Sequence, residues 1–596
     1  MYHINNFKYI LIFLTFNNIS VYSQLIELKN IENKELIRNT NFTLDTIQLP
    51  IWEDFSSYES KVGNNIWNAS NNVSINNYSN NFSPSINVLI LDGTDENGNS
   101  YNYINNFGKA DSLCSDIINL DSYQINDKLY LSFYWNYNVN GEFPDYEDSI
   151  KLEFYNKNHK WKTVWYKNGG SNNFPGNNFK YEIIQIKEEY LHDKFMFKFY
   201  NLGNTEGPFD SWALDYIYLN KNRNINDSTI LDRAITYKPK NIFKKYNSIP
   251  IKHFSSSHQS LDSIKVEILN FDSQIQPINY NLIAKEITHN IYDTIENKNP
   301  LNPILNGFER RLINNKYLNI DKFNINEDSI SIELKFFIES GDSIYINQNL
   351  RLNDTSISYF NMSNYYSYDD NGAEYAAGLN QKNSELVLKY NLLKKDTLTH
   401  IQILFPQSTN KTYTSGIKLI VYKKLNNEKI NLISDNMSLI NYGKDFNIYK
   451  LETPIIVSDT IYIGYKQFEN NLLSVGLDKN NNTSDEIYYY INNQWKQNNL
   501  IKGSLMIRPV FGDVENYLTN LNEDDNETIS IYPNPSSGIF YINKTIKHIQ
   551  IIDINGKIIN NLKNSKEFNI TNQKNGLYLV HIINKEKVII KKIIKN

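Results

Sequence analysis

The chain has 596 residues, of which 40% are apolar, 21% charged and 14% aromatic, so it is too long for a single hydrophobic core and several domains are expected. The formal net charge of −5 argues against a nucleic-acid-binding protein. The single cysteine, Cys114, excludes a framework of intramolecular disulfides.

The first 23 residues have the pattern of a secretory signal peptide. His3 and Lys8 precede an apolar stretch over residues 9–16, and small residues then lead to a predicted cleavage between Ser23 and Gln24. The apolar stretch is much shorter than the roughly 20 residues that span a bilayer, although an uncleaved anchor is the alternative. Because no later segment is apolar enough to predict a transmembrane segment, we expect an exported chain.

A lead-in over residues 24–47 precedes a first jelly-roll-like β-sandwich, which we predict for residues 48–222. Apolar and polar residues alternate in several runs there, for example over residues 129–135 and 195–199. A period of two places one set of side chains inside a sheet and the other set outside. Clusters of Gly, Asn and Pro separate the runs, which favours many short strands without intervening helices.

The rest of the chain also reads as β structure. Residues 230–355 predict a smaller β module of immunoglobulin-like or fibronectin-like type, and residues 358–512 predict a second jelly-roll-like sandwich. Residues 513–527 contain six acidic residues, no basic residue and no apolar pattern, which is typical of a linker. The expected fold class is therefore all-β and multidomain.

Residues 529–596 predict a small C-terminal β-sandwich of opposite charge. Eleven lysines stand against three acidic residues, giving a formal charge of +8. Three turn signals separate the predicted strands: the segment Tyr532, Pro533, Asn534, Pro535 and Gly538, the segment Asp553, Gly556 and Lys557, and the segment Gly576 and Tyr578. Gly538 is placed to supply a positive φ angle before a strand.

These motifs, in this order, resemble the type A C-terminal sorting domain of proteins exported by the type IX secretion system of Bacteroidota. The alternative is a terminal β domain with turns that match by chance. The resemblance implies that the signal peptide carries the chain across the inner membrane. Residues 529–596 would then engage the type IX secretion machinery, and the product would be released or attached to the outer-membrane surface.

The first sandwich resembles, more distantly, the jelly-roll modules of the MAM and reelin type. The residues behind this resemblance lie in the segments 92–93, 108–113, 130–134, 148–154 and 210–217. The chain lacks the disulfides of the animal modules. The resemblance implies adhesion or glycan contact rather than catalysis.

A short Gly-containing loop in the first sandwich carries several oxygen ligands. Asp92, Asp95, Asn97 and Asn99 could supply part of the six to eight oxygens that calcium takes. The loop lacks the distal acid of an EF-hand, and a solvated turn is the alternative, since Asp, Asn and Gly favour turns. Calcium is the one cofactor predicted, and a similar loop lies at residues 369–374.

Six of the seven tryptophans lie in the first sandwich. Trp135 and Trp212 lie in alternating strands and are expected in the core. Trp161 and Trp165 flank a turn and are better candidates for exposure, where they could stack on sugar rings. Core packing is the alternative for these two residues as well.

Motifs of known enzyme classes are missing from the sequence. It has no His-Glu-x-x-His zinc signature, no Gly-x-Ser-x-Gly elbow and no Gly-rich phosphate loop. Asp145, Glu147 and Asp148 are the densest acidic cluster that could serve a glycosidase. We therefore expect no catalytic residues and a non-catalytic binding or adhesion protein that contacts glycans or extracellular matrix. A secreted hydrolase with an unrecognised site and a structural surface-layer component are the alternatives.

Overall fold

The computed structural model describes most of residues 25–512 and 531–596. The residues not described within these ranges are 30–46, 58–65, 69–71, 77–81, 96–99, 102–106, 138–143, 171–175, 177, 208, 241, 255–260, 324–327, 343, 346–347, 407–415, 426–437, 554–557 and 584–587. The predicted signal peptide with Ser23 and Gln24, and the predicted linker 513–527, lie outside the described residues.

Strands dominate the described chain, which confirms the all-β fold class. No α-helix occurs among the described residues, where the helical turns are all of the 3₁₀ type. They are η1 (Ile125–Asp127), η3 (Glu188–Tyr190), η4 (Ile251–His253), η6 (Ile320–Lys322), η7 (Leu352–Asp354) and η8 (Ser484–Glu486). No helix in the described ranges is long and apolar enough to cross a membrane. The chain divides into two compact units, residues 1–512 and 513–596.

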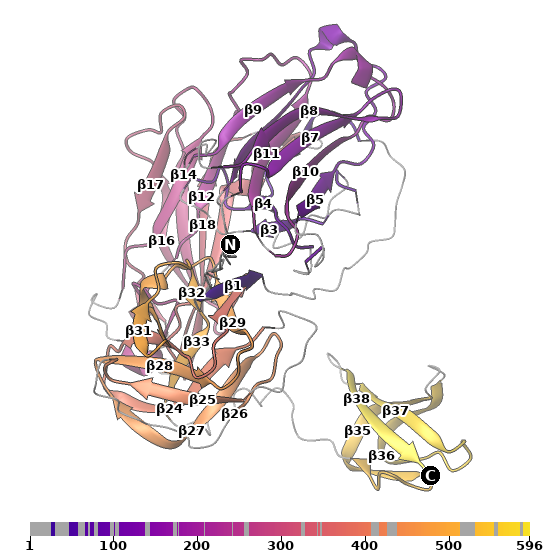
Figure 1. Ribbon diagram of the computed structural model, residues 1–596, viewed down its shortest axis with the longest axis vertical. Coiled ribbons are helices and arrows are strands. Elements are labelled where there is room, and N and C mark those ends of the chain that lie inside the picture. The colour runs from indigo at the N-terminus through magenta and orange to yellow at the C-terminus, as the bar shows by residue number, and fades with distance from the viewer. Residues whose placement is uncertain are drawn as a thin grey trace, which may run out of the picture. The chain divides into compact units, whose positions relative to one another are not determined.

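The first sandwich of the larger unit consists of two antiparallel sheets (Figure 1). One sheet has the order β5-β10-β7-β8, with β5 (Phe107–Cys114), β10 (Phe197–Asn204), β7 (Ser149–Tyr155) and β8 (Trp161–Asn168). The other has the order β3-β4-β11-β6-β9, with β3 (Ser74–Asn76), β4 (Val88–Leu91), β11 (Trp212–Asn220), β6 (Tyr130–Tyr137) and β9 (Lys180–Gln185), and β2 (Ile51–Glu53) also pairs with β11.

The core of this sandwich lies between the two sheets. Phe133 on β6 contacts Phe199 on β10, with ring centroids 4.8 Å apart, and Trp165 on β8, with centroids 4.9 Å apart. Side chains along β10 alternate between buried and half-buried, as a period of two predicts. The core predictions for Trp135 and Trp212 are confirmed, with 4% and 0% of their surfaces exposed.

The central part of the larger unit has two main sheets. The smaller has the order β12-β14-β17, with β12 (Arg233–Tyr237), β14 (Lys265–Asn270) and β17 (Arg310–Asn314). The larger has the order β13-β21-β18-β15-β16, with β13 (Ser248–Pro250), β21 (Thr355–Ser363), β18 (Ile330–Glu339), β15 (Asn279–Glu286) and β16 (Ile291–Pro300). A short hairpin joins β19 (Ile344–Tyr345) to β20 (Gln348–Asn349).

The next part has three sheets. The largest has the order β26-β25-β28-β23-β30-β31, with β26 (Ser438–Leu439), β25 (Gly416–Tyr422), β28 (Thr460–Gln467), β23 (Glu385–Asn391), β30 (Ile487–Ile491) and β31 (Gln494–Gln497). The second joins β27 (Phe446–Val457), β24 (Asp396–Leu404) and β33 (Ile507–Phe511). The third joins β1 (Ile26–Lys29), β22 (Tyr375–Leu379), β29 (Leu473–Asp478) and β32 (Ser504–Leu505).

Two features cross the predicted module boundaries. The lead-in contributes β1, which pairs antiparallel with β22, a strand that begins only at residue 375. Strand β21 runs through the boundary predicted at residues 355–358 and pairs with β18. One cluster of buried side chains extends on both sides of that boundary, for example from Leu334 through Met362 to Tyr390. Residues after about 235 therefore share a continuous core, and the division into two modules there stays a prediction.

The smaller unit is a compact β domain, drawn in yellow in Figure 1. Its strands are β34 (Ile531–Tyr532), β35 (Ile539–Asp553), β36 (Ile558–Asn569), β37 (Gly576–Ile583) and β38 (Val588–Lys595). They have the order β34-β35-β37-β38, and β36 pairs with β35. Phe540, Ile549 and Val580 are buried in its own core. A folded basic domain at this position agrees with the sequence prediction.

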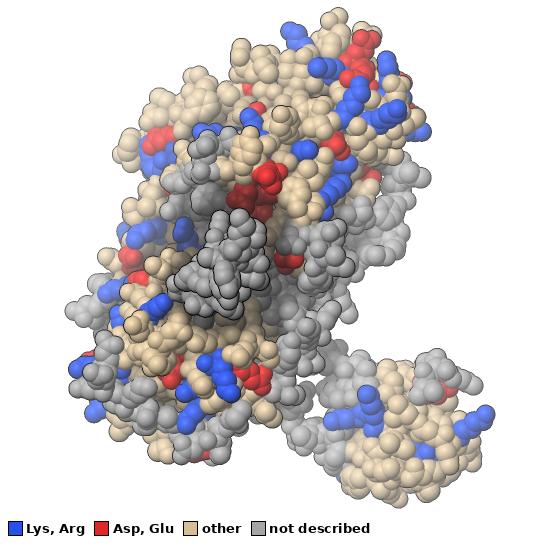
Figure 2. Space-filling view, in the orientation of Figure 1, with Lys and Arg blue, Asp and Glu red and all other residues tan. Residues whose placement is uncertain are grey.

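Charged residues are mixed on the surface of the larger unit. Figure 2 shows Lys and Arg interspersed with Asp and Glu over the face that it displays. This mixture agrees with the mild net charge of the chain.

Candidate functional site

One face of the β5-β10-β7-β8 sheet points away from the core and carries aromatic and charged side chains. We call this surface the aromatic face and define it by Glu153, Tyr155, Trp161, Lys198 and Tyr200. All five are half-buried, and Glu153, Tyr155, Lys198 and Tyr200 alternate along their strands with buried core residues. Tyr155 lies opposite Trp161, with ring centroids 5.2 Å apart, and Lys198 lies opposite Glu153.

Direct contacts hold the aromatic face together. The Lys198 ammonium lies 4.2 Å from the centre of the Trp161 ring and 2.9 Å from Glu153 Oε2. The Tyr200 hydroxyl donates a hydrogen bond to Glu153 Oε1 at 3.0 Å. Burial, followed by the nearby Glu153 carboxylate, raises the pKa of Tyr200 to about 12, so this hydroxyl keeps its proton at neutral pH. The result is a fixed surface that joins an indole ring to hydrogen-bonding groups.

The structure separates the two tryptophans that the sequence places together. Trp161 is half-buried on the aromatic face, whereas Trp165 is only 8% exposed and packs into the core, so the interpretation of Trp165 as an exposed residue is wrong and its core alternative holds. The reason is a register shift: Glu153 pairs with Thr163, but the preceding Leu152 pairs with Trp165. The extra residue in β8, Val164, reverses the faces on which the following side chains lie.

The predicted calcium loop is described only in part. Asp92 is fully buried, and its Oδ1 accepts hydrogen bonds from the Thr94 backbone N–H at 2.8 Å and the Thr94 hydroxyl at 2.5 Å. Asp95 is half-buried, and Asn97 and Asn99 lie outside the described residues. Asp92 therefore suits a cation only in part, because its Oδ1 already accepts two hydrogen bonds from Thr94.

A carboxyl pair near this loop was missed in the sequence. Asp148 and Asp210 are 3% and 6% exposed, and burial, followed by the charge of Asp210, raises the pKa of Asp148 to about 7. The sequence separates the two residues by more than sixty positions, so only the motif resemblance at residues 148–154 and 210–217 could have linked them. Their burial makes this pair a poor general acid and base for a polysaccharide chain.

A second acidic group could hold a metal ion. Each of Asp370, Glu374 and Asp478 offers a carboxylate oxygen within 4.8 Å of the others. Two of these residues belong to the loop that the sequence marks as similar to the first, and Asp478 ends β29. The Asn480 amide donates hydrogen bonds to Asp370 Oδ2 at 2.9 Å and to Glu374 Oε1 at 3.0 Å. Asn480 therefore bridges two of the carboxylates.

In the smaller unit, the segment with the first turn motif is tied to the last strand. The Asn534 side-chain amide donates to the Lys592 carbonyl, and its oxygen accepts from the Ile594 N–H. Gly538 has a φ angle of 125°, and a Cβ there would lie 2.6 Å from Thr571 Cα, which confirms the need for glycine.

The remaining motif residues of the smaller unit lie at or near strand ends. Tyr532 is the last residue of β34, Asp553 is the last residue of β35, and Gly576 and Tyr578 lie at the start of β37. Pro533 and Pro535 lie in the turn between β34 and β35, whereas Gly556 and Lys557 lie outside the described residues.

The comparison with protein families finds one match. Residues 530–596 match the model of the secretion system C-terminal sorting domain. This segment coincides with the small basic unit and with the motifs on which the sequence resemblance rests. No curated protein matches the chain.

Several solved structures have a distant likeness to this chain. The Bacteroides uniformis β-glucuronidase 2 bound to cyclophellitol-6-carboxylate aziridine is 10% identical, with a TM-score of 0.20, over 55% of this chain and 34% of that chain. A putative β-galactosidase from Bacteroides fragilis is 9% identical, with a TM-score of 0.16, over 44% and 33%. The ANX1 ectodomain from Arabidopsis thaliana is 9% identical, with a TM-score of 0.16, over 78% and 96%. The alignments cover about a third of each bacterial protein, and at these scores they carry no argument. The resemblance to MAM and reelin modules stays a prediction.

Proposed function

We propose that this chain acts as a non-catalytic binding or adhesion protein that contacts glycans or extracellular matrix. It does so at the cell surface or in the extracellular space, to which its sorting domain directs it as a cargo of the type IX secretion system. The single observation that carries the proposal is the aromatic face of the first sandwich. Trp161 offers an apolar ring to the C–H faces of a sugar. Glu153 and Lys198 lie beside it and offer an acceptor and a donor to sugar hydroxyl groups.

Catalysis receives less support from the described residues. The aromatic face has one carboxylate, Glu153, which is paired with Lys198, whereas glycoside hydrolysis generally needs two carboxyl groups that flank the bond. The carboxyl pair Asp148 and Asp210 is buried. We therefore keep binding as the proposed activity.

Replacement of Trp161 tests the proposal. In the full chain, Trp161→Ala is expected to weaken binding to polysaccharide by at least about tenfold, because a central aromatic anchor commonly contributes more than any neighbouring contact. Affinity electrophoresis in gels that contain a panel of polysaccharides measures the effect. The melting temperature should change little, since the ring is half-exposed.

Tyr292→Ala is the matched control for this experiment. Tyr292 is 60% exposed on β16, outside the first sandwich, so its removal takes away an exposed aromatic ring without touching the aromatic face. Equal retention of wild type and Trp161→Ala on every polysaccharide that binds would exclude the aromatic face as the contact surface.

Calcium is a second part of the proposal, with Asp92 and Asp95 as ligands in the loop over residues 92–99. We expect the calcium chelator EGTA to lower the melting temperature of the wild type. Asp95→Asn should remove this difference, because it neutralises a half-buried ligand without disturbing the buried hydrogen bonds of Asp92. Glu374→Gln, in the separate acidic group, should leave the difference in place. Loss of the calcium effect in Glu374→Gln instead would move the cation to that group, and no effect of EGTA would exclude calcium.

A further inference from the structure

Lysines outnumber acidic residues on the β5-β10-β7-β8 sheet, which carries the aromatic face. The four strands contain five lysines and two acidic residues. Of the two acids, Asp111 is buried, and Glu153 belongs to the aromatic face. The lysines are Lys109, Lys151, Lys162, Lys167 and Lys198. The outward surface of this sheet therefore has an excess of positive charge.

Two of these lysines have no carboxylate partner among the described residues. Ion pairs join Lys198 to Glu153, Lys162 to Glu189 and Lys167 to Glu182. Lys109 and Lys151 form no ion pair with any described residue. Lys109 is exposed, and Lys151 lies opposite Tyr200 of the aromatic face. An anionic ligand could supply a charge partner to both.

One tyrosine ring brings two of the ammonium groups close together. The Lys109 ammonium lies 4.8 Å from the centre of the Tyr200 ring, and the Lys198 ammonium lies 5.5 Å from it. Burial lowers the pKa of Lys109, and the charge of Lys198 lowers it further, while Glu153 opposes this shift. The two ammonium groups therefore repel each other, and an anion bound beside them would reduce that repulsion.

Aromatic rings accompany the lysines along the sheet. Tyr166 is 61% exposed on β8 and lies opposite Lys151. Trp161, on the same strand, lies under the Lys198 ammonium at 4.2 Å. Positions 161 and 166 are roughly 17 Å apart along a strand. A ligand that uses both pairs must be an extended chain with apolar ring faces and repeated negative charges.

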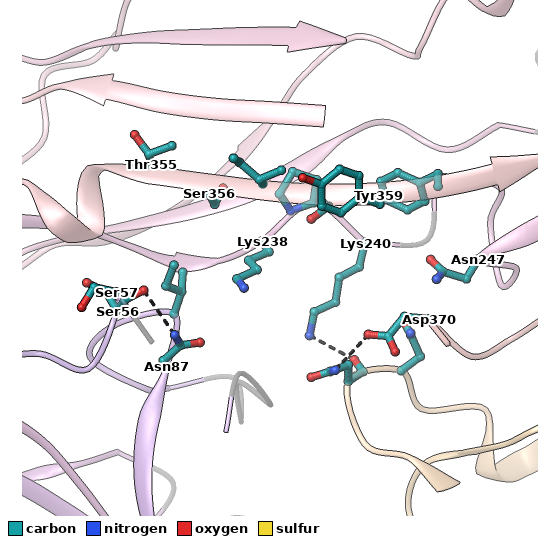
Figure 3. Close-up of a pocket in the computed structure, with 17 residues that line it drawn as sticks. Ser56, Ser57, Asn87, Lys238, Lys240, Asn247, Thr355, Ser356, Tyr359 and Asp370 are labelled. Carbon is teal, nitrogen blue, oxygen red and sulfur yellow. Dashed lines mark hydrogen bonds between the residues drawn. The ribbon is translucent and has the colours of Figure 1, made fainter. Parts of the chain in front are cut away.

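A pocket of about 530 Å³ where the first sandwich meets the central part carries two further lysines, Lys238 and Lys240. Figure 3 shows both on its wall, with Asp370 beside Lys240. The Lys240 ammonium donates a hydrogen bond to the Asn480 carbonyl at 3.0 Å. Burial lowers the pKa of Lys240 to about 8, whereas Asp478 and Asp370 act to raise it. Because acidic groups already offset this lysine, the sheet surface is the better candidate for an anion.

We propose that the aromatic face, together with the adjoining Lys109, Lys151 and Tyr166, binds an acidic polysaccharide. The carboxylate or sulfate groups of the polysaccharide lie at Lys109 and Lys151, and its sugar rings lie on Trp161 and Tyr166. This inference rests on the proposed function and deepens it, because it names the charge class of the glycan that the aromatic face recognises.

Affinity electrophoresis of the full chain in gels that contain polygalacturonate tests the proposal. The double variant Lys109→Gln/Lys151→Gln is expected to bind at least about tenfold more weakly, whereas Lys109→Arg/Lys151→Arg should retain binding, since arginine keeps the charge. Fully methyl-esterified polygalacturonate is the uncharged counterpart of this probe. Dextran sulfate, with dextran as its uncharged counterpart, separates sulfate from carboxylate recognition. Lys382→Gln/Lys395→Gln, at two exposed lysines outside the first sandwich, is the matched control for loss of charge.

The outcomes distinguish this inference from the proposed function. Retention by polygalacturonate or dextran sulfate that falls in the glutamine variant and persists in the arginine variant supports the inference. Retention of a neutral polysaccharide that is lost in Trp161→Ala and unchanged in the glutamine variant, without retention by either acidic polymer, overturns the inference and leaves the proposed function standing. Equal retention by acid and ester, or by wild type and the glutamine variant, overturns it as well. Equal retention by double-stranded DNA would show recognition of charge alone and would also overturn it.

Discussion

A chain that ends at residue 529 is expected to accumulate in the periplasm instead of reaching the cell surface or the medium. Residues 530–596 match the sorting domain and form a separate compact unit with its own core, so their removal should leave the fold of the larger unit intact. The expected effect is close to all-or-none. Immunoblots of periplasmic, outer-membrane and culture fractions measure it.

A transfer experiment is the control for this deletion. Fusion of residues 513–596 to a periplasmic reporter protein should send the reporter out of the same cells. Phe540→Ala, which removes a fully buried ring from the core of the small unit, should reduce export of the full chain without changing the larger unit. Normal release of the truncated chain would contradict the assignment of residues 530–596 as the sorting signal.

Raising the pH from about 4 to about 7 is expected to destabilise the larger unit through Asp354. This residue is 6% exposed in η7, and burial raises its pKa to about 7 from an ordinary 3.8. Asp342 raises the pKa further, whereas Arg233 and Arg351 oppose the rise. Because the folded chain holds this proton more tightly than the unfolded chain, the stabilisation is complete at low pH and is lost as the pH rises through the folded pKa. Each unit of pKa difference corresponds to about 1.4 kcal/mol, so the expected loss is on the order of 4 kcal/mol.

Asp354→Asn isolates this contribution. The amide keeps an acceptor for the hydrogen bond that Ser340 Oγ donates to Asp354 Oδ2 at 2.7 Å, but it cannot ionise. The variant should match the wild type at pH 4 and exceed its free energy of unfolding at pH 8 by a few kcal/mol, measured by urea unfolding. Asp328→Asn, at an exposed position, controls for the change in net charge. Parallel pH profiles of wild type and Asp354→Asn would contradict the assignment.

Asn353, the neighbour of Asp354 in η7, joins the first sandwich to the central part. The Asn353 side-chain amide donates to Asp54 Oδ2 at 3.0 Å, to the Tyr216 hydroxyl at 2.9 Å and to Asp232 Oδ2 at 2.8 Å. Asp54 and Tyr216 belong to the first sandwich, whereas Asp232 precedes β12. Burial raises the pKa of Asp54 and of Asp232 above the ordinary value of a carboxyl group.

Local sequence patterns were sufficient for the fold class and for the export signal. Strand β10 alternates from Phe197 onward as its sequence predicts, because a period of two depends only on which residues face the core. The turn glycine Gly538 could also be predicted, since its positive φ angle is a local requirement. Each motif of the sorting domain is a short contiguous segment, so it can be recognised in the sequence without knowledge of the fold.

Features that depend on distant pairing could not be predicted. No local pattern tells that Ile26 pairs with Gly378, or that Asp148 meets Asp210. Trp161 and Trp165 are four positions apart, so in a regular strand both side chains would lie on the same face of the sheet. Only the register shift in β8 places them on opposite faces. The pocket required the same knowledge, because its wall comes from segments up to several hundred positions apart.

The most direct test of the proposed function is a glycan array probed with the full secreted chain, followed by mass spectrometry of the glycans that retain it. The account predicts that the chain binds a defined set of glycans and leaves their masses unchanged. Shortened or otherwise altered glycans would show that the chain is an enzyme, and an array without any retained protein would remove glycans as its ligands.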